Sequence, residues 1–254
     1  MSDPRVRLER DGAIATIVLD RPEKLNALDA EMIAGIEACV ADIERDREIR
    51  VAIVTGAGEK AFCVGGDIKA WGALEPLRMG WEWVREGNRV FDRLAALRVP
   101  TIAAVNGYCF GGGLELALAC DIRIAAAETD FALPEAKVAI VPGWAGTRRL
   151  PALIGPARAK QMAFSGARVS AVTAEQWGLV NEAVPRADLM ARVWELAGEI
   201  AANSPAAVAI AKAGIDGRDD ALEVLAGALA RYTDDGKEGV ASFIGKRPPN
   251  YTGN

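Results

Sequence analysis

A glutamate that follows three consecutive glycines is the side chain best placed for chemistry in this sequence. The segment Asn106–Asp121 reads NGYCFGGGLELALACD, and the apolar run 101–105 before it predicts a buried strand. Strong helix formers follow the glycines, so the order predicts strand, turn and helix. The first amides of a helix lack helical partners, and glycines let another molecule approach the backbone. The turn is therefore a candidate cradle for an anion or an oxyanion, with Glu115 one helical turn beyond it.

Each candidate acid also allows a purely structural interpretation. Glycines before a helix can simply form a tight turn, and Glu115 can simply complement the helix dipole. Glu135 directly follows Pro134, where a carboxylate in a first helical turn stabilises the helix by roughly 0.3–1 kcal/mol. Neither residue alone decides between structure and catalysis.

The absence of histidine narrows the chemistry. It excludes Ser–His–Asp and Cys–His catalysis and every metal site with histidine ligands. Proton transfer must then use Asp, Glu, Lys, Tyr, Cys or bound water. The chain has 35 acidic residues but only three tyrosines, so carboxylates are the leading candidates.

Composition excludes several classes of protein. A length of 254 residues suits one large domain, or one domain with an appendage. The net charge of −5 argues against nucleic-acid binding, and the apolar runs are too short to span a membrane. The charged N-terminus has no apolar signal core. The cysteines form no C-x-x-C pair, so reduced thiols in a cytoplasmic protein fit best; they are Cys39, Cys63, Cys109 and Cys120.

Two more glycine turns precede the central segment. Gly65-Gly66 follows an extended stretch and precedes a short helical pattern, so it could supply an amide to the same oxygen as the central turn. The segment Gly56–Ala61 matches G-x-G-x-x-A, with Glu75 loosely placed for a ribose. Phe62-Cys63-Val64 follows that match and favours a strand where a nucleotide site needs a helix. An NAD-dependent dehydrogenase is therefore the least favoured alternative.

The remaining pattern predicts elements that would position these turns. Asp11-Gly12 predicts a hairpin turn, and Asp29 is a plausible N-cap of a helix. The segment 77–97 predicts one long helix. Its predicted inward residues are Trp81, Val84, Phe91 and Leu94. From residue 188 onward the pattern is helical, which predicts a boundary near 190 and a tail that docks on a partner or a neighbouring subunit. The predicted helices of this tail are 188–202, 205–214, 219–235 and 236–244.

Five segments in order resemble the crotonase superfamily, the enoyl-CoA hydratases and isomerases, over nearly the whole chain. They are RPEKLNAL (21–28), AFCVGGDIKA (61–70), IAAVNGYCFGGGLELALACD (102–121), FALPEAKVAIVPGWAGTRRLP (131–151) and EGVASFIGKRPPNYTG (238–253). The resemblance implies an α/β fold in which a spiral of ββα units (1–190) carries the site and a C-terminal helical region (191–254) mediates trimerisation. It also implies a homotrimer or homohexamer, a dimer of trimers.

The resemblance assigns roles residue by residue. The amides of Gly66 and Gly112 would form the oxyanion hole, and Glu115 and Glu135 would be the paired catalytic carboxylates. The positions that would contact the CoA thioester are Lys24, Leu25 and Ala27 along CoA, Asp67, Ile68 and Lys69 near the acyl-pantetheine turn, and Phe243 and Lys246 at the C-terminal end, in some members across a subunit boundary. No metal ion or redox cofactor is implied, because coenzyme A is part of the substrate.

The implied activity is that of a hydro-lyase, the syn addition or elimination of water at the 2,3 double bond of a 2-enoyl-CoA through an enolate. Leu133 and the FALPEAK wording are closest to the carnitinyl-CoA dehydratase branch. A Δ3,Δ2-enoyl-CoA isomerase needs only one proton-shuttling carboxylate, so two acids disfavour it. A non-catalytic CoA-thioester-binding or RNA-associated scaffold is a further alternative, which the intact acids and the acidic balance disfavour.

Two positions depart from the family pattern. Val64 is bulkier than the usual residue before the first oxyanion glycine, and Trp144 replaces a small residue in the glycine-rich corner 142–147. Our hypothesis is that Trp144 narrows or reshapes the acyl pocket. The alternative is a tryptophan that only packs in the protein or lies on its surface.

Overall fold

Two β-sheets form the centre of the molecule, and helices surround them. The computed structural model describes residues 5–217 and 220–253. The six-stranded sheet has the order β1 (Val6–Asp11), β2 (Ile14–Leu19), β3 (Val51–Gly56), β5 (Thr101–Val105), β7 (Ile122–Ala126) and β10 (Glu182–Val184). The four-stranded sheet has the order β4 (Ala61–Cys63), β6 (Tyr108–Phe110), β8 (Asp130–Ala132) and β9 (Val169–Ser170).

The chain alternates between the two sheets as it advances. Strands β3, β5 and β7 of the large sheet are each followed directly by a strand of the small sheet, and helices lead to the next pair. In the large sheet, the described strands β2, β3, β5, β7 and β10 are parallel, and β1 is antiparallel to β2. In the small sheet, β8 and β9 are antiparallel. This repeated strand–strand–helix progression is the α/β spiral that the sequence predicted.

The first helix and the first hairpin agree with the sequence pattern. Gly12 has a φ of 56°, which lets the chain reverse between β1 and β2. Asp29 is the N-cap of helix α1 (Ala30–Arg45), and its side chain accepts a hydrogen bond from the Met32 amide. Apolar residues at helical spacing bury one face of α1 in the core; they are Met32, Ile36, Val40 and Ile43.

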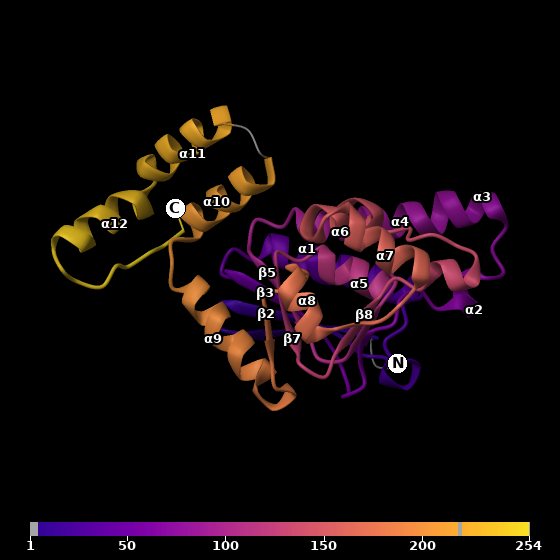
Figure 1. The fold of residues 1–254 in the computed structure, drawn as a ribbon. Helices are drawn as coiled ribbons and strands as arrows, with labels where there is room; N and C mark the ends of the chain where they lie inside the picture. Colours follow the sequence, from indigo (N-terminus) through magenta and orange to yellow (C-terminus); the bar gives the residue numbers. More distant parts are fainter. Residues whose placement is uncertain (1–4, 218–219, 254) are drawn as a thin grey trace.

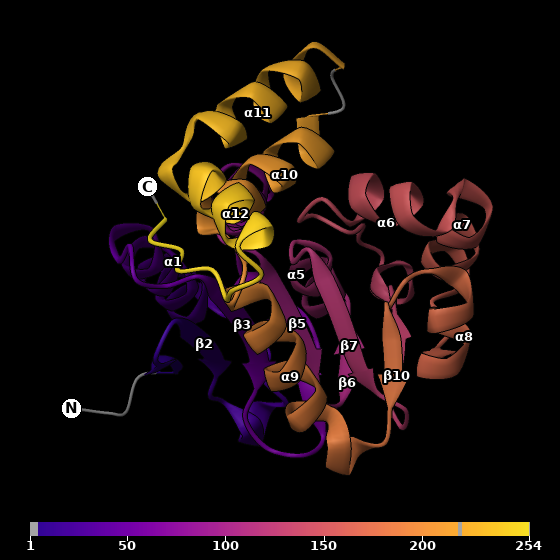
Figure 2. The same ribbon diagram turned by 90° about the vertical axis from the view of Figure 1, so that its left-hand side faces the viewer.

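Helix α9 (Leu189–Ala201) covers one face of the large sheet, as Figure 2 shows. Leu189, Val193 and Ala197 form a second apolar cluster with β-branched and alanine side chains of the central strands. The first helix of the predicted C-terminal region therefore shares a core with the sheet. The division into regions 1–190 and 191–254 stays a prediction.

The segment 77–97 is not one regular helix, so that prediction is wrong in detail. It consists of α3 (Pro76–Arg78), a π-helical stretch η2 (Met79–Val84) and α4 (Arg85–Ala95). A π-helix has more residues per turn than an α-helix, so a period of 3.6 places its side chains wrongly. Trp81 is 67 % exposed and not inward, and the Arg85 guanidinium lies 5.5 Å from its ring centroid.

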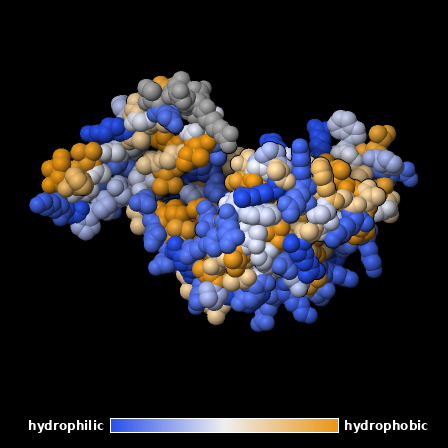
Figure 3. Space-filling model, in the orientation of Figure 1, coloured by the Kyte–Doolittle hydropathy of each residue, from blue (hydrophilic) through white to orange (hydrophobic). Residues whose placement is uncertain are grey.

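The last three helices extend away from the sheets (Figure 1). They are α10 (Pro205–Gly217), α11 (Asp220–Tyr232) and α12 (Asp234–Ile244). Lys212 ties α10 to the core through a 2.7 Å ion pair with Asp121. Orange areas lie on this part of the molecule at the left of Figure 3. The exposed large hydrophobic side chains of these helices are Ile215, Leu225, Leu229, Tyr232, Val240, Phe243 and Ile244.

Short helices complete the fold between the strands. They are η1 (Pro22–Lys24), α2 (Ile68–Trp71), α5 (Gly112–Leu118), η3 (Glu135–Val138), α6 (Gly146–Ile154), α7 (Pro156–Ser165), α8 (Ala171–Trp177) and η4 (Arg186–Asp188). All four cysteines are buried and free. None of the described helices is long and apolar enough to cross a membrane.

Candidate active site

The Gly65-Gly66 turn and the turn at Gly111–Gly113 meet at the end of the small sheet. Strands β4 and β6 are parallel neighbours, so the turns that follow them leave the sheet at the same edge. A Cβ placed on Gly65 would lie only 3.1 Å from the amide nitrogen of Gly112, so the two backbones are in contact. Gly65 also has a φ of 99°, a conformation that side-chain-bearing residues rarely adopt.

The amides of Gly66 and Gly112 are not used by regular secondary structure. Leu28 donates to the Gly65 carbonyl at 2.8 Å and accepts from Asp67 at 2.7 Å, which is the pattern of a parallel bridge. In such a bridge the residue between the two bonds directs its own amide away from the partner. Gly112 is the first residue of α5, where amides have no helical acceptor. Both glycines line the same cavity.

This cavity has a volume of about 200 Å³ and a mostly apolar wall. Its charged lining residues are Glu115, Glu135 and Lys137. The other lining residues come mainly from the glycine turns, from 68–84 and from the corner near 143; they are Val64, Gly65, Gly66, Ile68, Trp71, Met79, Trp83, Val84, Gly111, Gly112, Pro134, Val138, Ile140, Val141, Gly143 and Trp144.

Glu115 is held as a hydrogen-bond acceptor at the inner side of the cavity. Its side chain is on α5, and the residue is only 2 % exposed. The Oε1 atom accepts the backbone amides of Trp144 and Gly146, both at 2.7 Å. Burial raises the pKa of Glu115, and these backbone hydrogen bonds oppose the rise because they favour the carboxylate.

Glu135 has a different environment at the same cavity. It begins η3 and is 9 % exposed, and its buried Oε2 has no hydrogen-bond partner among the described residues. A Cβ on Gly111 would lie 2.9 Å from its Oε1, so this carboxyl group touches the central glycine turn. Burial, with a smaller contribution from the Glu115 charge, raises the pKa of Glu135 to about 7. Near neutral pH, Glu135 therefore carries a proton in a large fraction of molecules.

Trp144 both packs in the core and lines the cavity. The residue is 3 % exposed, and its ring centroid lies 5.1 Å from that of Trp83 and 5.3 Å from that of Phe91. Trp144 therefore packs in the core and also lines the cavity, whereas its effect on an acyl pocket stays a prediction. Val64 also lines the cavity, whereas Leu133 is buried in the core.

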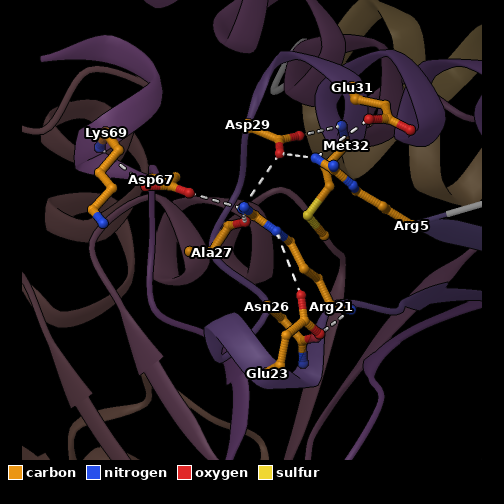
Figure 4. A network of polar contacts seen from close by, with 10 residues as sticks. All are labelled: Arg5, Arg21, Glu23, Asn26, Ala27, Asp29, Glu31, Met32, Asp67 and Lys69. Atoms are coloured by element: carbon orange, nitrogen blue, oxygen red, sulfur yellow. Dashed lines mark hydrogen bonds and ion pairs between the residues drawn. The ribbon is translucent and has the colours of Figure 1, made fainter. Parts of the chain in front are cut away.

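The partly buried Arg21 joins the loop 21–28 to the Gly65-Gly66 turn (Figure 4). Arg21 Nη1 donates to the Ala27 carbonyl at 3.0 Å and to Asp67 Oδ2 at 2.9 Å. The same nitrogen lies 3.3 Å from Asp29 Oδ2, and Asp29 also pairs with Arg5. This network fixes the loop relative to the residue that follows Gly66.

The predicted CoA-contacting residues fall into three groups. Ile68 lines the cavity, whereas Asp67 and Lys69 lie beside it, where Asp67 caps α2 by accepting the Lys69 amide at 3.0 Å. Lys24, Leu25 and Ala27 belong to the loop 21–28, and the Leu25 carbonyl accepts the Val64 amide at 3.3 Å. The third group is at the C-terminal end and consists of Phe243 and Lys246.

Phe243 and Lys246 are not brought to the cavity within one chain. Phe243 is 86 % exposed on α12, and Lys246 is exposed in the turn after that helix. Neither lines the cavity formed by the described residues. Their contact with CoA, including contact across a subunit boundary, stays a prediction.

Sequence reasoning missed much of the cavity wall. Trp71, Met79 and Trp83 line it, but the sequence marked none of them as functional. Met79 and Trp83 lie in the π-helix, where a regular helical period fails. Lys137 was also missed, although it lies two positions after Glu135 in η3. The available signal was the density of large apolar residues between the first glycine turn and α4.

The nucleotide-binding match near Gly56 lacks the helix that such a site needs, as the sequence indicated. Gly56 ends β3, and β4 begins at Ala61 after a loop. The side chain of Asn106 donates to the carbonyls of Gly56 and Gly58, and Asn26 donates to the Ala61 carbonyl. Side-chain amides therefore hold this loop in its conformation.

Comparison with known proteins supports one family over nearly the whole chain. A family model described as enoyl-CoA hydratase/isomerase matches residues 9–254. The short-chain-enoyl-CoA hydratase of Clostridium acetobutylicum is 39% identical over 249 aligned residues, with 95% of each chain covered. The carnitinyl-CoA dehydratase of Salmonella typhi is 39% identical over 259 residues, with 98% of each chain covered. The crystal structure of an enoyl-CoA hydratase from Bacillus anthracis matches with a TM-score of 0.94 and 36% identity, covering 98% of this chain and 100% of that chain.

Proposed function

The chain belongs to the enoyl-CoA hydratase/isomerase family, and from this premise we propose that it adds water across the 2,3 double bond of a 2-enoyl-CoA thioester, or removes it in reverse. The observation that carries the proposal is the convergence of two acids and two backbone amides on one cavity. The acids are Glu115 and Glu135, and the amides belong to Gly66 and Gly112.

The two amides would stabilise the enolate that forms during the reaction. Water attacks C3, and the electron pair of the double bond moves toward the thioester carbonyl oxygen. Donors that are already in place for that oxygen need no reorganisation, and each contributes about 3–4 kcal/mol in comparable sites. Gly66 and Gly112 suit this role because they leave their amides unused and bring no side chain into the cavity.

The environments of the two acids favour different roles. We assign Glu115 as the base that accepts a proton from water, because two amides hold its Oε1 and favour the carboxylate. We assign Glu135 as the acid that protonates C2, because a pKa raised to about 7 keeps a large fraction of it protonated near neutrality. Such groups contribute roughly 10²–10⁴-fold each. Both acids line one cavity. We propose that they act on the same face of the bound substrate, which gives syn addition.

The proton balance closes within the pair. After addition, Glu115 holds the proton taken from water, and Glu135 has lost one to C2. Transfer of a proton from Glu115 to Glu135, directly or through water, restores the starting state. No metal ion or redox cofactor enters this scheme.

Coenzyme A would lie along the loop 21–28 and the turn after Gly66. The proposed contacts are Lys24, Leu25, Ala27, Asp67, Ile68 and Lys69. Phe243 and Lys246 would reach the coenzyme from the C-terminal helices, in a homotrimer or in a dimer of trimers. The exposed apolar residues of these helices support an assembly of this kind. A cytoplasmic location stays a prediction from the sequence.

A Δ3,Δ2-isomerase and a non-catalytic scaffold are the competing functions. The test is to incubate the purified protein with crotonyl-CoA and to follow the loss of the conjugated thioester absorbance. Conversion of a 3-enoyl-CoA without hydration of crotonyl-CoA would favour the isomerase. Binding of acyl-CoA in calorimetry with neither reaction would favour the scaffold. Hydration of crotonyl-CoA supports our proposal.

A further inference from the structure

A glycine inside helix α4 makes room for the indole of Trp144. Gly87 is buried in α4, and a Cβ placed on it would lie 2.1 Å from Nε1 and 2.3 Å from Cε2 of Trp144. No side chain can approach that closely, so only glycine is compatible with this position of the ring. A glycine inside a helix costs roughly 1 kcal/mol relative to alanine. Gly87 therefore lowers the stability of helix α4 but leaves the space that the indole of Trp144 occupies.

The indole is confined on its other edge as well. A Cβ on Gly112 would lie 2.4 Å from Cζ3 of Trp144, so the ring lies between a glycine of α4 and the first glycine of α5. Its Nε1 donates to the Trp83 carbonyl at 3.2 Å, and the Phe91 ring packs edge-on against it. Close packing on these sides prevents the ring from rotating out of the way.

The position of this fixed ring and the size of the cavity together limit the acyl group that the site can hold. Trp144 touches Gly112, one of the proposed oxyanion donors, so the ring lies beside the reacting end of an acyl group. The cavity of about 200 Å³ is smaller than the roughly 300–1,000 Å³ of typical small-molecule sites. The thioester carbonyl and the attacking water must share this space with the acyl group. A small cavity with a fixed wall therefore favours a short acyl chain.

We propose that Trp144, held by Gly87 and Trp83, is the fixed end wall of the acyl site and restricts the enzyme to short acyl chains. This proposal rests on the proposed function, because it concerns the acyl group of the same thioester. It names Gly87, which does not line the cavity, as a residue that sets specificity by positioning Trp144.

The test compares kcat/KM for 2-enoyl-CoAs of four, six, eight and ten carbons. The wild-type protein should prefer the four-carbon substrate to the eight-carbon one by at least tenfold. Trp144→Ala should shift this ratio at least tenfold toward the longer chain. Gly87→Ala should lower kcat/KM for the four-carbon substrate at least tenfold, because its Cβ displaces the indole.

A double variant shows whether Gly87→Ala acts by displacing Trp144 or by a general disturbance of packing. Gly87→Ala combined with Trp144→Ala should recover most of the activity lost in Gly87→Ala, because the atoms nearest the new Cβ all belong to the indole. Trp177→Ala is the matched control, since this tryptophan lies outside the cavity, with the Arg158 guanidinium 5.3 Å from its ring centroid. It should leave the chain-length ratio unchanged. If Trp144→Ala does not fold, Trp144→Leu makes the same comparison with less lost volume.

Three results would overturn the proposal. They are equal turnover of four- and ten-carbon substrates by the wild type, an unchanged ratio in the folded Trp144 variant, and simple additivity in the double variant. If no enoyl-CoA is hydrated, the proposed function fails instead. Calorimetry with saturated acyl-CoAs then tests whether Trp144 limits the length of the acyl chain. If it does, butyryl-CoA binds more tightly than octanoyl-CoA, and Trp144→Ala loses that preference.

Discussion

Glu115 and Glu135 face one cavity with opposite hydrogen-bonding states. Oε1 of Glu115 accepts two backbone amides at 2.7 Å, whereas the buried Oε2 of Glu135 has no partner among the described residues. Burial raises the pKa of both acids, but at Glu115 the two backbone hydrogen bonds oppose this rise because they favour the carboxylate. This difference supports the assignment of Glu115 as the base, which removes one proton, and of Glu135 as the acid, which delivers another.

The pH dependence of kcat/KM for crotonyl-CoA reports the pKa values of the essential acid and base in the free enzyme. Burial raises the pKa of Glu135 to about 7, so we expect kcat/KM to fall about tenfold per pH unit well above that value. Initial rates between pH 5 and 9 with crotonyl-CoA measure it. In Glu135→Gln, the residual rate should lose this alkaline decline. A profile that stays flat up to pH 9 in the wild type would contradict the role of Glu135 as the acid.

Stability should depend on pH through the same group. The pKa of Glu135 is about 7 in the folded protein and 4.5 in the unfolded chain. Its contribution to stability is therefore fully present below pH 4.5 and is lost as the pH rises through about 7. Glu135→Gln should therefore be more stable than the wild type at pH 8, by up to about 3 kcal/mol, and should lose this advantage near pH 4. Denaturant unfolding at both pH values provides the measurement, and a pH-independent difference would argue against a buried, protonated Glu135.

Gly146 is required for the position of Glu115. A Cβ on Gly146 would lie 2.8 Å from Glu115 Oε1 and 2.9 Å from its Cγ, so Gly146→Ala must displace the carboxylate. We expect at least about a 100-fold loss of kcat, the size of a general-base contribution. Gly198→Ala is the matched control, because a Cβ there meets nothing within 4 Å in helix α9. The control should keep full activity and gain up to about 1 kcal/mol of stability. Equal activity of the two variants would refute this positioning of Glu115.

Arg21 links the loop 21–28 to the first glycine turn, so its loss should weaken substrate binding more than turnover. Arg21→Met removes the hydrogen bonds to the Ala27 carbonyl and to Asp67, which have limited exposure to solvent. We expect a loss of stability of about 2 kcal/mol and a severalfold rise in KM for crotonyl-CoA with a smaller change in kcat. Arg45→Met removes an exposed ion pair with Asp42 and should change neither value measurably. A fall in kcat with unchanged KM would contradict the link between this loop and CoA.

Metal removal tests the expectation that no cofactor is needed. The proposed steps use only carboxylates, backbone amides and water. Dialysis against EDTA, followed by the crotonyl-CoA assay, should leave kcat within twofold of its starting value. A loss of activity that Mg²⁺ or Zn²⁺ restores would show that the account of the site is incomplete.

The sequence predicts the central part of the site well because that part is local. Three glycines between an apolar run and strong helix formers predict the turn before α5, and Glu115 lies within the same short segment. The sequence also marked Glu135 and the Gly65-Gly66 turn, which come from separate segments, and the resemblance to a family assigned them catalytic roles. The structure brings all of them to one cavity.

The parts that the sequence missed depend on contacts between distant segments. Met79 and Trp83 line the cavity from a π-helix, and a regular period of 3.6 does not predict this geometry. The need for glycine at position 87 becomes visible only when Trp144 is packed against α4. Phe243 lies on α12 and Lys246 in the turn after it, and this part of the chain extends from the core, so a neighbouring subunit would decide their role.

The most direct measurement of the central claim is the rate of crotonyl-CoA hydration by Glu115→Gln and Glu135→Gln. Each variant should remain folded in thermal unfolding and bind a saturated acyl-CoA with affinity close to that of the wild type. Each should lose at least about a 100-fold factor in kcat, because each would lack one of the two proton transfers. Near-normal hydration by either folded variant would contradict the role that we assign to that acid.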